Sequence, residues 1–183
     1  MSKENRKFIG YFVDKNDNPT DETFIGWKAR NMAVTIIMAD IFTRKVLLER
    51  RGPGCPDNIG KLCCPCGYLN WDETLAEAAA REAYEETGFK IDISKVKMLY
   101  INDNPKSHLQ NVTVRFFGSV TDDEIDYALK NNIINTDTQS RGGEANEVSE
   151  FLWVNIDDVM ENYNPDDFAF NHYEMIKDTF KTL

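Results

Sequence analysis

The sequence predicts an α/β fold in which helices cover a mixed β-sheet. Short runs rich in β-branched and aromatic residues recur along the 183 residues, bounded by turn residues, and such runs are typical of strands. Segments with the apolar spacing of helices interrupt them at irregular intervals. No repeat or long linker divides the chain, so we expect a single domain over 1–183, with an N-terminal extension over 1–30 that can contain a strand.

Six runs have the composition of strands. They cover residues 8–13, 32–41, 45–51, 96–101, 112–120 and 149–156. Residues 72–87 have a different period, because Leu75 and the alanines at 76, 79, 80 and 83 lie on one face of a helix. Asn70 or Asp72 can cap the start of this helix, and Gly88 supplies the left-handed residue that ends it.

Two further helices are expected after the fifth strand. The first covers residues 122–132. The second covers 168–180 and places four apolar residues on one face, namely Ala169, Tyr173, Ile176 and Phe180.

The formal charge of the chain is −10, with 42% hydrophobic and 11% aromatic residues. This composition argues against disorder, and the acidic balance argues against a nucleic-acid partner, since phosphate backbones require a surplus of Lys and Arg. The N-terminal residues are polar, and the longest apolar run ends at Asp40 after eight residues, so we expect no signal peptide, no membrane span and a cytoplasmic location. A small anionic substrate would need metal ions or well-placed basic side chains to approach.

All four cysteines lie between positions 55 and 66. Cys63 and Cys66 have the CxxC spacing of half a zinc site or a redox pair, whereas a closed zinc site needs four ligands. The remaining candidate ligands are Cys55, Cys64, His108 and His172. The histidines are far away in the sequence, so the composition favours reduced thiols in a strand over zinc.

The helix over 72–87 concentrates carboxylates. Glu82, Glu85 and Glu86 share roughly one quadrant of its surface. Arg81 is spaced to form i,i+4 ion pairs with Glu77 and Glu85, which would leave Glu82 and Glu86 uncompensated. Such a cluster is either a solvated surface or a seat for a hard divalent cation, because Mg²⁺ binds clustered carboxylate oxygens together with substrate phosphates.

The residues around this helix favour the second interpretation. The segment "GYLNWDETLAEAAAREAYEETGF", residues 67–89, resembles the signature of the Nudix hydrolases, GX5EX7REUXEEXGU, in which U is an apolar residue. Every fixed letter is present, and Ala83 is smaller than the usual aliphatic residue at U. The sequence is therefore identified as a member of this family, with residues 67–89 as its Nudix box.

The resemblance implies an α/β/α sandwich with a loop-helix-loop catalytic motif, and hydrolysis of a nucleoside diphosphate linked to another moiety with Mg²⁺ or Mn²⁺. It makes Glu82, Glu85 and Glu86 metal ligands and the carbonyl of Gly67 a further ligand. Arg81 would orient the glutamates, and Glu73 would have a structural role near the start of the helix. Cys66 departs from the pattern, because many members have glycine there.

Family members often supply a general base from a loop remote from the box. The segment "SRGGEANEVSEFLWV" offers three glutamates for this role. Glu147 is the first choice and Glu144 the second, with Glu150 as a third candidate.

Two features favour ADP-ribose or a similar sugar nucleotide as the substrate. Pro105 is the sixteenth residue after Phe89, a spacing similar to that in ADP-ribose pyrophosphatases of the family, and "AFNH" resembles an "AFDH" motif of proteins that handle NAD metabolites, with Asn171 departing from Asp. Arg51 and Arg115 are candidate phosphate contacts, as is Arg50.

Other functions remain open at this point. They include a Nudix hydrolase of (d)NTPs, NADH or another nucleotide, and a non-catalytic ADP-ribose sensor. Because family members often dimerise, the resemblance also allows a homodimer with the N-terminal residues in its interface.

Overall fold

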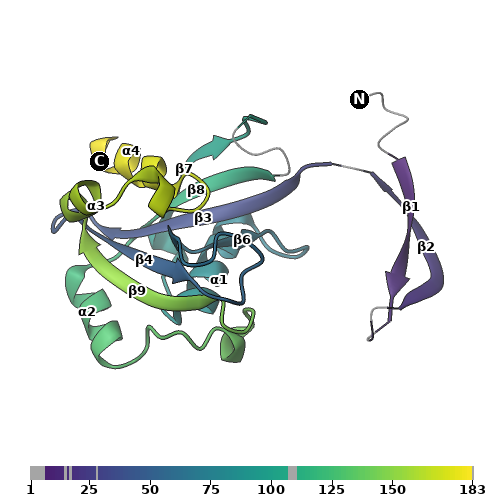
Figure 1. Ribbon diagram of the computed structural model, residues 1–183, viewed down its shortest axis with the longest axis horizontal. Coiled ribbons are helices and arrows are strands. Elements are labelled where there is room, and N and C mark those ends of the chain that lie inside the picture. The colour runs from purple at the N-terminus through teal and green to yellow at the C-terminus, as the bar shows by residue number, and fades with distance from the viewer. Residues whose placement is uncertain (1–6, 15, 17, 28, 107–110, 183) are drawn as a thin grey trace.

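The computed structural model describes residues 7–14, 16, 18–27, 29–106 and 111–182. His108, considered above as a zinc ligand, lies outside them. Figure 1 shows a layered body formed by residues from about Asn31 onward and an N-terminal hairpin that stands apart from it. The hairpin consists of β1 (Lys7–Val13) and β2 (Pro19–Trp27), which pair antiparallel.

Among the described residues, the sheet of the body has seven strands. They are β3 (Asn31–Asp40), β4 (Lys45–Arg51), β5 (Leu62–Cys63), β6 (Cys66–Tyr68), β7 (Val96–Asn102), β8 (Asn111–Ser119) and β9 (Val148–Asn155). The order is β5-β4-β3-β8-β7, with β6 paired to β3 and β9 paired to β4. The sheet is mixed, because β3 and β8 run parallel and the other pairs antiparallel.

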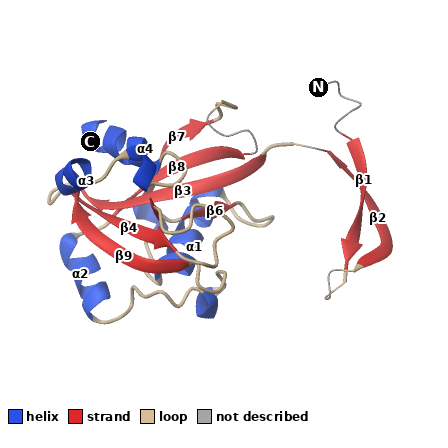
Figure 2. Cartoon of the chain, in the orientation of Figure 1, coloured by secondary structure: helices blue, strands red, loops and turns tan. Residues whose placement is uncertain are grey.

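Helices cover both faces of this sheet (Figure 2). One face packs against α1 (Leu75–Thr87) and α2 (Asp122–Lys130), and the other against α3 (Ile156–Asn162) and α4 (His172–Thr182). Short 3₁₀ turns at Ile93–Lys95, Gln139–Arg141 and Pro165–Asp167 complete the connections. The predicted α/β class with an α/β/α sandwich is confirmed.

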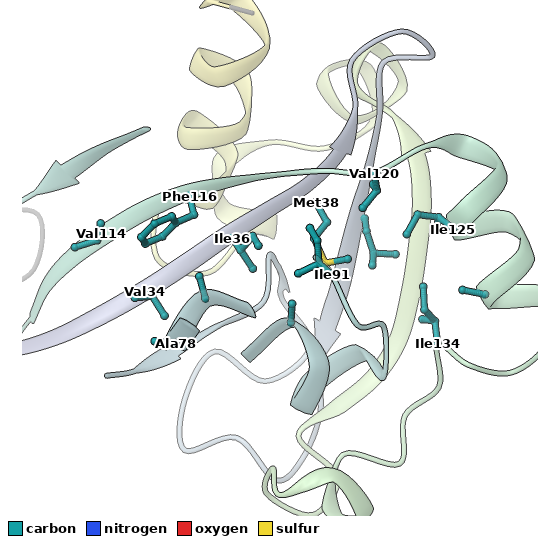
Figure 3. Packing of buried hydrophobic residues seen from close by; sticks show 14 residues of the cluster. Val34, Ile36, Met38, Ala78, Ile91, Val114, Phe116, Val120, Ile125 and Ile134 are labelled. Atoms are coloured by element: carbon teal, nitrogen blue, oxygen red, sulfur yellow. The ribbon is translucent and has the colours of Figure 1, made fainter. Parts of the chain in front are cut away.

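Strand β3 contributes to both cores because alternate side chains point to opposite faces. Val34, Ile36 and Met38 pack towards the alanines of α1, as Figure 3 shows for Ala78. Ile37 and Ala39 belong to the second core, under α3 and α4. Burial on both faces explains why β3 reads as a nearly continuous apolar run rather than as an alternation.

The six predicted strands are all present, within one residue at each end. The sequence did not predict β2, β5, β6 and α3. Strands β5 and β6 are only two and three residues long and lie in a cysteine-rich segment, so no periodicity identifies them. Helix α3 begins at Ile156, where the strand over 149–156 was expected to end.

Two predictions about helix ends were wrong. Helix α1 is capped by Thr74 rather than by Asn70 or Asp72, because Thr74 forms a capping box with Glu77, with each side chain accepting from the other residue's backbone N–H. Helix α4 begins at His172 rather than at 168, since Phe170 and Asn171 adopt left-handed φ angles of 55° and 60°, which a helix cannot accommodate. The predicted end at Gly88 is confirmed, with φ 84°.

The described part of the chain contains no helix with the length and apolarity that a membrane crossing requires.

Candidate active site

The candidate site lies where the sheet splits. Strands β3 and β4 pair only at Ala39 with Val46 and at Asp40 with Lys45, and then they diverge. The segment 62–68 occupies the space between them, with β5 on β4 and β6 on β3. The Ile36 N–H donates to the carbonyl of Pro65, which ties the connection between β5 and β6 to β3. This arrangement places β6 directly beside α1.

Arg81 organises three carboxylates of the box. Its Nη1 donates to Glu82 Oε1 at 2.7 Å and to Glu85 Oε2 at 2.9 Å. Its Nε and Nη2 bind both oxygens of Glu73 at 2.8 and 2.7 Å, and Nη2 also donates to the carbonyl of Tyr68. Arg81 therefore connects the strand, the loop and the helix, as an orienting residue must.

One ion pair predicted from spacing is wrong. Arg81 does pair with Glu85, four residues later, but it does not pair with Glu77. Glu77 turns back to the helix start, where its Oε2 accepts from the N–H of Thr74 at 2.8 Å. Arg81 binds Glu73 and Glu82 instead, so Glu82 is not left without a cation as the sequence suggested.

Glu73 has the structural role that the family resemblance implies. Its Oε1 accepts from the Asn70 N–H at 2.8 Å, and the carboxylate receives two bonds from Arg81. It fixes the loop before α1 and the guanidinium at the same time.

Gly67 touches the Glu82 carboxylate with its backbone. A Cβ added at Gly67 would overlap the carboxyl atoms of Glu82. Only glycine allows this approach, which brings the β6 backbone and the α1 carboxylate together as the predicted metal site requires.

Glu86 is almost completely buried, with 2% of its surface exposed. The backbone N–H of Cys66 donates to its Oε2 at 2.8 Å. Cys66 thus acts on the site through its main chain, which explains how the turn can carry cysteine in place of the usual glycine. Cysteine 66 itself is partly buried.

Sequence reasoning missed Glu49, which the structure brings to the same place. Glu49 lies on β4, is 2% exposed, and accepts from the Cys63 thiol at 3.2 Å. The charges of Glu86 and Glu147 lie close enough to act on it. A glutamate within a hydrophobic strand is normally predicted to face outwards. Only the tertiary structure shows that the Glu49 side chain faces inwards.

Of the three base candidates, the structure brings Glu147 closest to the box. Glu147 is half-buried, and its charge acts on both Glu82 and Glu86. The loop that carries it is fixed to the β4–β5 connection, because its carbonyl accepts from the N–H of Gly52 and from the Cys55 thiol. Glu144 and Glu150 are exposed, and Glu150 pairs with Arg50 at 2.7 Å.

The carboxyl groups of this cluster share one electrostatic property. Burial raises the pKa of Glu82 to about 7, although Arg81 acts in the opposite direction. Burial also raises the pKa of Glu49 to about 7. The pKa of Glu86 lies well above its usual value because of burial and the nearby charge of Glu49, and burial raises the pKa of Glu147. The cluster therefore favours a bound positive charge.

The C-terminal end of α1 is held by a residue that the sequence did not single out. Arg141 donates through Nε to the carbonyl of Glu85 and through Nη2 to the carbonyl of Glu86, both at 3.1 Å. A cation at the last carbonyls of a helix is favourable. Arg141 comes from a loop far along the chain, so no local pattern reveals it.

The candidate substrate-binding residues lie in different environments. Arg51 is mostly buried, donates to the carbonyl and the carboxylate of Asp57, and stacks over the Phe170 ring at 4.9 Å. Pro105 is exposed in the turn after β7. Arg50 donates to Glu150 and to the carbonyl of Gly60.

Arg115 lies inside the body, on the sheet face opposite α1. It is 2% exposed and donates to Thr35 Oγ1, to the Met175 sulfur and to Asn171 Oδ1. His172 is equally buried and accepts the Cys64 N–H at its Nδ1. The "AFNH" segment therefore joins α4 to the sheet, with Asn171 and His172 both engaged in internal bonds.

All four cysteines lie in the described part of the chain, and none of them forms a disulfide there. Burial raises the pKa of Cys63, Cys64 and Cys66, so these thiols stay protonated. Within the described ranges, no three His, Cys, Asp or Glu side chains have the spacing of a preformed metal site.

The donor set nevertheless fits a hard divalent cation. The bonds from Arg81 and from the Cys66 N–H use one oxygen each of Glu82, Glu85 and Glu86. The second oxygen of each has no hydrogen-bond donor among the described residues. Carboxylate oxygens and a backbone carbonyl are the ligands that Mg²⁺ and Mn²⁺ prefer.

Comparison with known structures supports the same fold. The chain is similar to the NUDIX domain of Shewanella oneidensis NrtR complexed with ADP ribose, with 19% identity, a TM-score of 0.60, and coverage of 85% of this chain and 90% of that one. It is also similar to a Nitrosomonas europaea NUDIX hydrolase, with 19% identity, a TM-score of 0.58, and coverage of 94% and 85%.

A third similar structure is a bifunctional NMN adenylyltransferase/ADP ribose pyrophosphatase from Francisella tularensis, complexed with AMP and a Mn ion. It is 16% identical, with a TM-score of 0.59 over 85% of this chain, and this chain spans 42% of its length. The family model of the NUDIX domain matches residues 29–179, most of the chain. The chain belongs to the NUDIX family.

Proposed function

We propose that this Nudix hydrolase cleaves the pyrophosphate bond of a nucleoside diphosphate linked to another moiety, with ADP-ribose or a similar sugar nucleotide as its substrate, and that it requires Mg²⁺ or Mn²⁺. The observation that carries the proposal is the carboxylate cluster of α1, in which Glu82 and Glu86 are buried, against the backbone of Gly67. Burial raises the pKa of Glu82 and Glu86, and each carboxylate of the cluster has an oxygen without a hydrogen-bond donor among the described residues, which suits the cluster to divalent cations.

Glu82, Glu85 and Glu86 would hold the cation, together with the Gly67 carbonyl. When bound, the cation supplies neutralisation of the diphosphate charge and a lowered pKa for a bound water. A protein of charge −10 needs such neutralisation to accept an anionic substrate.

The protein's own residues have separate tasks in this scheme. Arg81, fixed by Glu73, keeps Glu82 and Glu85 in place, and the Cys66 N–H keeps Glu86 in place. Glu147, on the loop facing the box, is the proposed general base that takes the proton from the attacking water.

Four observations bear on the substrate. Two similar proteins are described with ADP ribose or as an ADP ribose pyrophosphatase, and Pro105 is exposed at the end of β7. The "AFNH" segment gives less support than its sequence suggested, because Asn171 and His172 are engaged inside the protein. Arg51 is the better candidate for a phosphate contact, and Arg115 would have to act from beneath the surface.

The four free cysteines agree with a reducing compartment, which supports the proposed cytoplasmic location. The acidic charge supports the proposed absence of a nucleic-acid partner.

A substrate panel tests the proposal. Purified protein is incubated with ADP-ribose, NADH and (d)NTPs at several Mg²⁺ and Mn²⁺ concentrations, and AMP, ribose 5-phosphate and pyrophosphate are measured. We expect AMP and ribose 5-phosphate from ADP-ribose, loss of activity with EDTA, and a decrease of at least 10²-fold for Glu85→Gln.

The alternatives predict other results. Cleavage of (d)NTPs or NADH with ADP-ribose left intact would replace the proposed substrate. Binding of ADP-ribose without cleavage of any nucleotide would indicate a sensor. No cleavage at any metal concentration would overturn the proposal.

A further inference from the structure

Glu49 is a buried carboxylate that the Nudix box does not include. It lies on β4 between Leu48 and Arg50 and is 2% exposed, and its strand partners are Cys63 on one side and Phe151 on the other. An ionisable group in this position costs free energy unless a partner compensates it. The position therefore requires a reason beyond packing.

The protein gives Glu49 little compensation. Its Oε1 accepts from the Cys63 thiol, which is a weak donor, and its Oε2 is buried without a hydrogen-bond partner among the described residues. Arg51, two residues later on the same strand, could pair with it. The Arg51 guanidinium donates to Asp57 instead, and acts on Glu49 only through its charge. A carboxylate with a purely structural role would be expected to take that cation.

The group that Glu49 does face is another carboxylate. Glu86, from α1, lies close enough for the two carboxyl groups to interact and is itself 2% exposed. The Cys66 N–H donates to one Glu86 oxygen. Two ionised carboxylates buried together repel each other unless they share a proton or a cation lies beside them, and α1 also carries Glu82 and Glu85.

We infer that Glu49 is a positioning residue of the divalent-cation site. Glu49 keeps the Glu86 carboxylate turned towards the cation and adds negative charge behind that carboxylate. The inference rests on the proposed function, because it takes Glu86 to be a ligand. It extends the site from α1 onto β4. Partners behind a ligand of this kind contribute about 10- to 100-fold in metal affinity.

The Mn²⁺ affinity of Glu49 variants distinguishes this positioning role from a purely structural role. Glu49→Gln keeps the shape of the side chain and an oxygen for the Cys63 thiol, but it removes the charge. Glu49→Asp keeps the charge on a shorter side chain. Glu161→Gln, on the exposed side of α3, is the matched control because it makes the same charge change far from the box.

Titration calorimetry and the electron paramagnetic resonance signal of free Mn²⁺ give the affinity of each protein in the absence of substrate. We expect Glu49→Gln to bind Mn²⁺ at least 10-fold more weakly than the wild type, Glu49→Asp to recover part of this loss, and Glu161→Gln to bind normally. The metal-free melting temperature of Glu49→Gln should equal or exceed that of the wild type, whereas a structural role would lower it.

The outcomes are distinguishable. If the wild type binds Mn²⁺ and Glu49→Gln binds it within twofold, the inference is overturned and the proposed function stands. If the wild type binds no Mn²⁺, both are overturned. If Glu49→Gln loses its fold in the metal-free state, Glu49 has a structural role and the inference is also overturned.

Discussion

The guanidinium of Arg81 binds the carboxylate of Glu73 through two parallel hydrogen bonds, Nε to Oε2 at 2.8 Å and Nη2 to Oε1 at 2.7 Å. This fork leaves Nη1 to bind Glu82 and Glu85. Glu73, eight residues before Arg81, thus determines where the arginine points and, through it, where two proposed metal ligands lie. Bidentate pairs of this kind are both strong and geometrically specific.

Glu73→Gln should lower activity by way of Arg81. An amide accepts only at its oxygen, so one of the two bonds is lost and Arg81 is less well fixed. We expect kcat, measured by steady-state kinetics, to fall about 10-fold. The free energy of unfolding, measured by urea denaturation, should decrease by about 1–2 kcal/mol. Glu77→Gln is the matched control, because glutamine also serves in a capping box, so neither quantity should change. Equal effects of the two substitutions would contradict this role for Glu73.

Gly67→Ala should damage the site locally. The added methyl group overlaps the Glu82 carboxylate and pushes it from its position. We expect at least a 10-fold loss in Mn²⁺ affinity and in kcat, measured by calorimetry and kinetics, with the fold retained by circular dichroism. Tyr68→Phe, on the same strand with an exposed side chain, should leave both quantities unchanged. Normal metal binding by Gly67→Ala would refute the proposed contact.

Glu147→Gln and Glu144→Gln compare two glutamates of one loop. Glu147 is half-buried and acts on the box, and Glu144 is exposed. We expect Glu147→Gln to reduce kcat by about 10²-fold at saturating metal and to abolish the acidic limb of the pH–rate profile. Glu144→Gln should retain nearly full activity. The reverse order of effects would identify Glu144 as the base.

His172 should make the protein sensitive to acid. Burial lowers its pKa well below 6.5, so the folded state keeps the ring neutral while the unfolded state takes up a proton as the pH falls below about 6.5. The contribution of His172 to stability is therefore complete above pH 6.5 and is lost progressively below it. Because nearby carboxyl groups with raised pKa values act in the opposite sense, the difference between wild type and His172→Gln isolates it.

The measurement is the melting temperature of both proteins at pH 5.5 and 7.5. The advantage of the wild type over His172→Gln should shrink by several degrees at the lower pH. A difference that is constant with pH would show that His172 does not titrate in this range.

We expect the protein to form a homodimer through its N-terminal hairpin. Ile9 and Ile25 face each other across β1 and β2 and are 76% and 61% exposed. A two-stranded hairpin alone is only marginally stable in water, so a covering partner is expected, and we propose a second copy of the chain.

Light scattering after gel filtration checks this prediction. The wild type should have the mass of a dimer. The double variant Ile9→Lys with Ile25→Glu, which replaces the apolar pair by an ion pair across the strands, should be monomeric. Tyr127→Ser, which removes an exposed aromatic side chain on α2, should remain dimeric. A monomeric wild type would exclude the homodimer.

The Nudix box could be located from the sequence because the residues that define it lie close together in the chain. The spacing of Glu82, Glu85 and Glu86 places them on one side of a helix whatever that helix packs against. Gly88 ended the helix as predicted, because a left-handed residue is a local requirement. The predicted capping residue was wrong, because several polar residues precede the helix. Which of them caps it depends on side-chain geometry that the sequence does not show.

What the sequence by itself determined is the set of strands, the box helix and the family, since these depend on periodicity and on residues close in the chain. Only the tertiary structure decided that Glu49 turns inwards to Glu86, that Arg141 holds the end of α1, and that Arg115 and His172 are buried where the start of α4 meets the sheet. These relationships join residues 37 to 108 positions apart. They follow from how β3 and β4 diverge and how the loops close over them, which no local pattern encodes.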